Sequence, residues 1–159
     1  MPSTRGKARI FEIMAFLRAL APGGPTDLGE AMKKFVAEHE RRGLVVVLSD
    51  LYDPHGFERG INVLRYAKFE TLVLEIADAR EASPDVVGDV RLVDCETGEA
   101  RELTVTPKLR ERLRAAHEAH HLAVQRFCAE RQVSHFRADV SVPFDEIVLR
   151  VLRRGGAVA

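Results

Sequence analysis

Three side chains that carry oxygen ligands follow an apolar run in the first half of the chain. Ser49, Asp50 and Asp53 come directly after residues 44–48, a valine-rich segment typical of a buried parallel strand. Ligands of open α/β sheets bind outside the carboxyl ends of the strands. A hydroxyl and two carboxylates are hard donors suited to Mg²⁺. The competing interpretation is that these residues only end the strand and cap the next helix.

A group of histidines lies on a predicted helix in the second half. His117, His120 and His121 recur at spacings of three and four, and Cys128 follows His121 by two helical turns. With Glu118, the first and last of these histidines satisfy the bare H-E-x-x-H string, so zinc binding is one hypothesis. Such a site needs a further ligand and an open cleft, whereas the same helix side carries apolar residues that need burial. We therefore expect the histidines to pack or to lie at the rim.

Other binding and catalytic chemistries are poorly represented. The basic residues Lys108, Arg110, Arg112 and Arg114 are interspersed with glutamate and have no aromatic neighbours for base stacking. Because 24 basic residues balance 24 acidic ones, the formal net charge is zero and nucleic-acid binding is not expected. The chain also has no phosphate-binding glycine motif and no nucleophile elbow. We expect a protein that is not an enzyme.

The elements that must position these residues alternate between strand and helix. Helices are predicted over residues 8–20, 26–43, 57–66, 106–131 and 144–153, and strands over residues 44–48, 71–76 and 134–137, with a β-hairpin near 89–105. Thr26 is the expected N-cap of the second helix. The first strand is expected to be central, and the alternation predicts a mostly parallel sheet.

Composition indicates one ordinary globular domain. The chain has 159 residues, of which 30% are charged and 46% hydrophobic. Cys95 and Cys128 have no spacing typical of a metal or redox motif, which favours a reducing compartment. No segment approaches about 18 uninterrupted apolar residues, so we expect no membrane span and a cytoplasmic location.

Three segments together resemble a known family. GGPTDLGEAM, RRGLVVVLSDLYDP and RLVDCETGE occur in the order and spacing of the carboxy-terminal part of the domain-of-unknown-function-58 family, a branch of the von Willebrand factor A-like domains. The resemblance spans most of the chain. It implies a three-layer, mostly parallel Rossmann-like sheet lacking the first strand, with the hairpin inserted near 89–105. Residues 1–159 would then form a single partial domain.

The resemblance to von Willebrand factor A-like domains also implies a metal-ion-dependent adhesion site. There, a D-x-S-x-S loop, a distant threonine and a distant aspartate surround a divalent cation. By motif, Thr26 matches the threonine and Asp50 the aspartate. Asp27, Ser49 and Asp53 are the neighbours that could support these two ligands.

The chain departs from this pattern in one respect. No D-x-S-x-S loop or strand precedes residue 8, and the string at residues 139–143 has proline in place of the second serine. We therefore expect Mg²⁺ to bind weakly or not at all, because two protein ligands hold this ion poorly. The missing strand would leave a sheet edge unpaired, which predicts dimerisation or shielding by the first helix.

The resemblance implies a function in protein interaction. We expect a non-catalytic module whose partner completes the metal shell with an acidic side chain. Family association further suggests a MoxR-type AAA+ ATPase as the partner. The alternative is a Mg²⁺-dependent phosphoryl hydrolase that uses Asp50 and Asp53 at the strand end.

Overall fold

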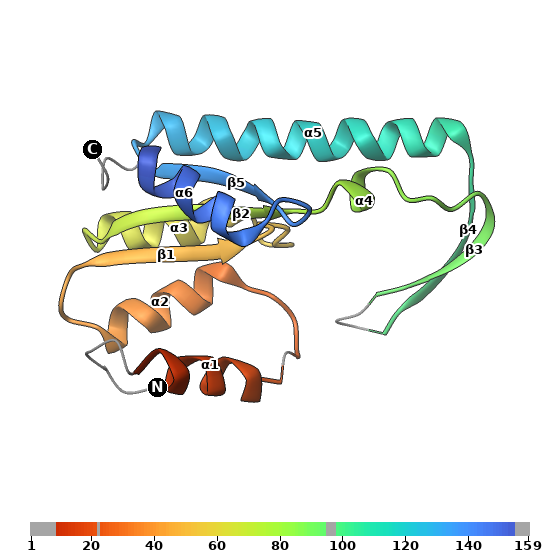
Figure 1. The fold of residues 1–159 in the computed structure, drawn as a ribbon. Coiled ribbons are helices and arrows are strands. Elements are labelled where there is room, and N and C mark those ends of the chain that lie inside the picture. The colour runs from red at the N-terminus through yellow and green to blue at the C-terminus, as the bar shows by residue number, and fades with distance from the viewer. Residues whose placement is uncertain (1–8, 22, 95–97, 155–159) are drawn as a thin grey trace.

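Three parallel strands form the centre of the molecule. The structure is a computed structural model and describes residues 9–21, 23–94 and 98–154. Strands β1 (Leu44–Ser49), β2 (Glu70–Ala77) and β5 (Ser134–Asp139) pair in the order β1-β2-β5 (Figure 1). Val47 lies opposite Val73, which in turn lies opposite His135. The predicted parallel sheet is confirmed.

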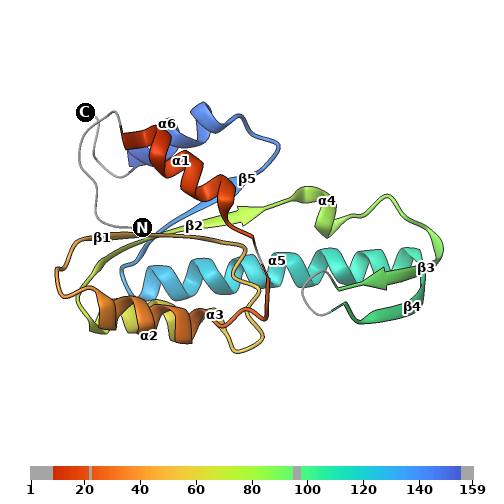
Figure 2. The ribbon, with the colours of Figure 1, turned by 90° about the horizontal axis from the view of Figure 1, so that it is seen from below.

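Six helices and a hairpin complete the described chain. The helices are α1 (Ile10–Ala19), α2 (Leu28–Glu38), α3 (Phe57–Tyr66), α4 (Ala79–Ala82), α5 (Pro107–Glu130) and α6 (Phe144–Arg154), and the hairpin consists of β3 (Gly88–Val93) and β4 (Ala100–Val105). Helices α2, α3 and α5 lie on one side of the sheet, and α1 and α6 lie on the other (Figure 2). The antiparallel pair of β3 and β4 confirms the hairpin predicted near residues 89–105. Cys95 lies outside the described residues.

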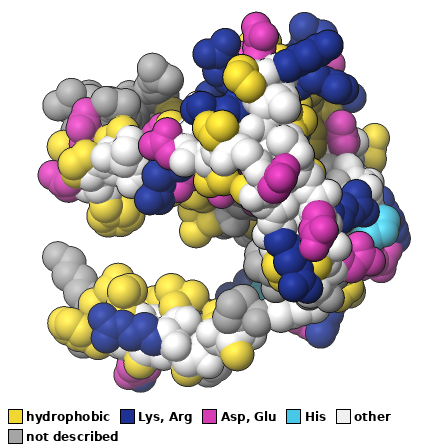
Figure 3. All heavy atoms as spheres, turned by 90° about the vertical axis from the view of Figure 1, so that its right-hand side faces the viewer, with side chains coloured by type: hydrophobic (Ala, Val, Ile, Leu, Met, Phe, Trp, Pro, Cys, Tyr) yellow, Lys and Arg dark blue, Asp and Glu magenta, His cyan; other side chains and the backbone are white. Residues whose placement is uncertain are grey.

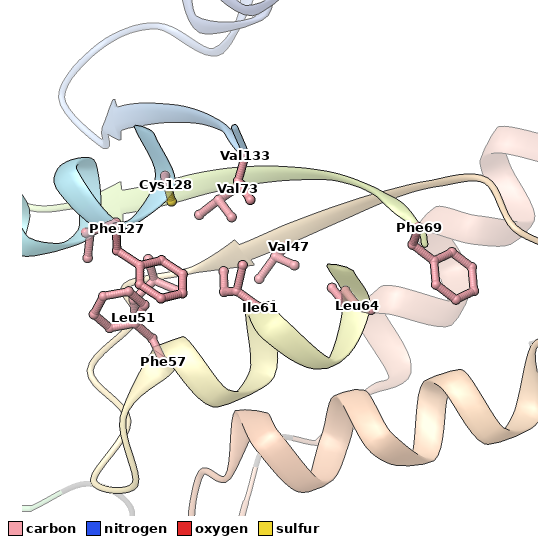
Figure 4. Packing of buried hydrophobic residues seen from close by; sticks show 11 residues of the cluster. Val47, Leu51, Phe57, Ile61, Leu64, Phe69, Val73, Phe127, Cys128 and Val133 are labelled. Atoms are coloured by element: carbon pink, nitrogen blue, oxygen red, sulfur yellow. The ribbon is translucent and has the colours of Figure 1, made fainter. Parts of the chain in front are cut away.

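The hydrophobic core lies between the sheet and helices α3 and α5. Val47 and Val73 point from the strands toward Ile61, Leu64 and the carboxy-terminal part of α5 (Figure 4). Full burial of side chains of this size stabilises the fold by about 1.5–3 kcal/mol each. This core fixes β1 and β2 against α3, so the loop between β1 and α3 begins and ends on anchored residues.

The start of α2 differs from the prediction by one residue. Asp27, not Thr26, is the N-cap, and its carboxylate accepts a hydrogen bond from the backbone N–H of Glu30 at 2.8 Å. Both residue types cap helices well, so local preference alone does not separate them. At α5 the predicted cap is confirmed, because the hydroxyl of Thr106 accepts from the backbone N–H of Leu109.

The second face of the sheet is largely open at β1. This strand pairs with β2 alone among the described residues, so the expected central strand lies at an edge. Leu44, Val46 and Leu48 are exposed on the side away from the core, and α1 buries none of its residues. Figure 3 shows a hollow on this side, with hydrophobic side chains on both of its walls. The first helix therefore does not seal the apolar strand face.

Candidate functional site

The loop after β1 is a tight turn held by its own side chains. The hydroxyl of Ser49 accepts a hydrogen bond from the backbone N–H of Leu51 at 3.0 Å, and Asp50 Oδ1 accepts one from that of Tyr52 at 3.1 Å. Leu51 has a φ of 63°, a left-handed conformation that is unfavourable for a branched side chain, yet it is 1% exposed. Burial of Leu51 in the core therefore holds the turn in place.

Asp53 joins this loop to the preceding helix. Its Oδ2 accepts a hydrogen bond from the backbone N–H of Leu28 at 2.6 Å, and its Oδ1 accepts one from that of His55 at 2.7 Å. Burial alone would raise the pKa of Asp53, but the hydrogen bonds from His55 and Leu28 and the nearby His55 ring outweigh it and lower the pKa. Asp53 thus helps Asp27 to cap α2, the helix before the strand, by accepting the N–H of its first residue. The competing interpretation, that these residues cap the next helix, is not supported, because the N-cap of α3 is Gly56 and no side-chain hydrogen bond caps this helix.

The two predicted ligand segments lie side by side at this point. Asp27 and Asp53 both approach His55, whose Nδ1 is 3.8 Å from Asp27 Oδ2 and 3.4 Å from Asp53 Oδ1. Thr26 is exposed and directly precedes Asp27, and Asp50 is exposed in the adjoining loop. The structure therefore brings the first turn of α2 to the end of β1.

Helix α5 supports the other side of the loop through aromatic contacts. The Tyr52 ring stacks on His120 with centroids 4.2 Å apart, and its hydroxyl is hydrogen-bonded to His117 Nδ1 at 2.8 Å. Partial burial, followed by the charges of Glu81, Glu75 and Asp50, raises the pKa of Tyr52. These contacts make Tyr52 a bridge between the strand end and α5.

The histidines of α5 contact other elements, as expected, and do not support the H-E-x-x-H hypothesis. His117 contacts Tyr52, whereas His121 Nδ1 lies 2.9 Å from Glu75 Oε2 on β2. Cys128 is buried, and desolvation raises its pKa to about 11, which disfavours the thiolate that zinc would need. The structure therefore does not support zinc binding through His117 together with His121.

The sequence prediction missed a buried group formed by Glu75, His121 and His135. His135 Nε2 on β5 lies 2.7 Å from Glu75 Oε2, and the side chain of Glu75 is 5% exposed. Burial alone would raise the pKa of Glu75, but hydrogen bonds to both histidines lower it. One ligand atom from each residue lies within 4.8 Å of the other two. A search of the described residues for three or more His, Cys, Asp or Glu side chains close enough to share a metal ion gives this group.

A weak signal for this group is present in the sequence. Glu75 occupies an inward position of β2, in phase with the buried residues Thr71 and Val73. A charged residue at such a position needs a partner, because burial of an unpaired carboxylate is costly. The partner's identity depends on the pairing of β2 with β5, which strand patterns do not specify.

Comparison with known proteins identifies a family for most of the chain. Residues 1–123 match the model of a family described as "Protein of unknown function DUF58". No solved structure matches the chain significantly. Within the described residues, the helices are too short or too polar to cross a membrane.

Curated relatives come from mycobacteria and are uncharacterized. Proteins of Mycobacterium bovis and Mycobacterium tuberculosis are each 34% identical to the chain over 143 residues, which is 87% of this chain and 44% of theirs. A protein of Mycobacterium avium is 35% identical over 100 residues, covering 63% of this chain and 59% of its own length. The chain thus spans less than half of the two longer relatives.

Proposed function

Because the chain belongs to the DUF58 family of unknown function, we propose that it is the carboxy-terminal part of a von Willebrand factor A-like domain and acts as a protein-interaction module. The observation that carries this proposal is the hydrogen bond from Leu28 N–H to Asp53. It places the Thr26 segment beside the loop that contains Asp50. Those are the two segments that an adhesion-type site would take from this part of the fold.

The open edge of β1 supports the same proposal. A further parallel strand could add beside β1, and a loop after it would reach the carboxyl end of the sheet next to Asp50. The apolar residues Leu44, Val46 and Leu48 would then be covered by the rest of the fold. An interaction module of this kind would present its partner-binding surface at the strand end.

The residues of this chain fit only part of a metal site. Thr26 and Asp50 are exposed oxygen donors, but Asp50 Oδ1 already accepts the N–H of Tyr52, and Asp53 is engaged in capping α2. Mg²⁺ prefers six oxygen ligands in near-octahedral geometry. When bound, the ion would link this surface to an acidic side chain of the partner. We expect weak or no Mg²⁺ binding by this chain alone.

The proposed partner class is a MoxR-type AAA+ ATPase. This assignment follows from the family resemblance. The exposed oxygens of Thr26 and Asp50 would suit an acidic partner segment in the presence of Mg²⁺.

Binding to a MoxR-type ATPase of the same organism tests the proposal. Biolayer interferometry with Mg²⁺ and with a chelator should show weaker binding without Mg²⁺, and at least tenfold weaker binding for Thr26→Ala and Asp50→Ala. Glu38→Ala is the matched control, because this acidic residue is exposed at the other end of α2. Mg²⁺-dependent binding that survives both substitutions would remove the proposed surface. Phosphoester turnover that Asp50→Ala abolishes would instead establish the hydrolase alternative.

A further inference from the structure

We propose that Glu75, His121 and His135 form a site for a divalent transition metal of the zinc class, separate from the proposed strand-end site. Each ligand comes from a different element, β2, α5 and β5 respectively. His121 Nδ1 and His135 Nε2 both approach Glu75 Oε2, at 2.9 and 2.7 Å. Two imidazole nitrogens and one carboxylate oxygen are a ligand set that zinc accepts, often with water in the fourth position.

Charge balance favours a cation at this place. Glu75 is buried, and its hydrogen-bond and ion-pair partners among the described residues are the two histidines, without a lysine or arginine. These two imidazoles compensate the negative charge of the carboxylate only in their protonated form. A buried charge without compensation is unfavourable. A divalent cation between the three side chains would neutralise the carboxylate and use the same three ligand atoms.

The geometry needs only a small adjustment. Zinc bonds of about 2.0–2.2 Å in a tetrahedron place neighbouring ligand atoms about 3.4 Å apart. Side-chain rotation would have to lengthen the contacts of 2.9 and 2.7 Å by about 0.5–0.7 Å to reach that spacing, and all three ligand atoms already lie within 4.8 Å of one another. The side chain of His121 is 16% exposed, which leaves solvent access to the group. Nitrogen ligands favour zinc and similar transition metals over Mg²⁺ or Ca²⁺.

The backbone positions the ligands before any ion binds. Val73 is paired with His135 in the parallel ladder, and Glu75 follows Val73 on the same face of β2. His121 lies one helical turn before the buried residue Val124 of α5, whose packing fixes the helix against the sheet. Preorganised ligands lose little conformational freedom on binding, so the free-energy cost of assembly is low.

Zinc titration of the metal-stripped chain tests the proposal. Isothermal titration calorimetry with Zn²⁺ at pH 7.5 should show one equivalent bound by the unsubstituted chain. We expect His121→Ala and His135→Ala to weaken binding at least 100-fold. His117→Ala is the matched control, because His117 lies on the same helix but contacts Tyr52. The Zn²⁺ affinity of this variant should stay within twofold of that of the unsubstituted chain. Failure of the chain to bind one equivalent, or an equal loss in the control, would overturn the proposal.

Two further measurements cover substitutions that disturb folding. Glu75→Gln keeps the shape of the side chain and should also weaken Zn²⁺ binding at least tenfold while the circular dichroism spectrum stays unchanged. X-ray absorption of the zinc-loaded chain should show two imidazoles and light-atom ligands. A sulfur ligand would point to cysteine and overturn the assignment. Neither readout depends on Mg²⁺ or on the ATPase, so the zinc site and the strand-end function can fail independently.

Discussion

Asp53 ties the strand-end loop to α2 through a direct hydrogen bond to the first turn of the helix. It accepts two backbone hydrogen bonds in a nearly inaccessible position, whereas the exposed Asp50 accepts one within its own turn. Loss of Asp53 would leave the N–H groups of Leu28 and His55 without their acceptor. We expect Asp53→Ala to lower the free energy of unfolding by about 1–3 kcal/mol, and Asp50→Ala by less than about 1 kcal/mol. Urea unfolding measures both, and equal losses would contradict the capping role.

The charge of Asp53 should make this contribution depend on pH. Its pKa is lowered in the folded chain, and an unfolded aspartate titrates near pH 3.9. The stabilisation by the carboxylate is therefore complete well above about pH 4 and is lost as the pH falls through the lower folded value. We expect the stability difference between the unsubstituted chain and Asp53→Asn to be constant above about pH 5 and to shrink below about pH 4. Urea midpoints from pH 2.5 to 7 test this, and a constant difference would refute it.

At the scale of elements, the close crossing of α2 and α3 holds the site segments together. A methyl group added at Gly60 of α3 would lie 2.6 Å from Leu28 Cγ and 3.0 Å from the Leu28 backbone oxygen. The three atoms nearest to a methyl group added at Gly29 all belong to the side chain of Arg59, which is partly exposed and able to move. The small residue at position 60 thus lets α3 approach the first turn of α2.

Substitution of the two glycines separates packing from helix preference. Alanine favours a helix over glycine by about 1 kcal/mol, but overpacking costs about 1–3 kcal/mol. We expect Gly60→Ala to destabilise the chain by about 1–2 kcal/mol and Gly29→Ala to change stability by less than about 0.5 kcal/mol. Thermal unfolding followed by circular dichroism provides the comparison. A stabilised Gly60→Ala variant would show that the helices do not pack as closely as described.

Local sequence signals predict these elements well but not their relations in space. The apolar run of β1, the turn residues of the hairpin and the Thr106-Pro107 start of α5 each specify an element through neighbouring residues. The cap of α2 was misplaced because Thr26 and Asp27 both suit that position. Asp53 could not be recognised as its partner, because that contact spans 25 residues and depends on how the β1 loop folds back.

At the scale of the whole molecule, the strand order decides which distant residues meet. Glu75 meets His135 only because β5 pairs with β2, and His121 joins them only because α5 covers that face. Periodicity identified the His121 helix and suggested only His117 as a possible ligand partner, because both lie on that helix, whereas Glu75 and His135 lie on strands. The family resemblance suggested that Thr26 and Asp50 lie in adjoining segments. It did not predict that the neighbouring Asp53 accepts a hydrogen bond from the first residue of α2.

The open apolar edge of β1 should control association of the isolated chain. Unpaired strand edges bind other strands, and Val46 adds an exposed apolar side chain to this one. We expect the chain to self-associate with rising concentration, and Val46→Lys to shift it toward the monomer because a charged edge resists pairing. Tyr66→Lys is the control, because Tyr66 is also an exposed apolar residue but lies at the end of α3. Light scattering after size exclusion measures the mass, and equal effects of both substitutions would exclude β1 as the contact.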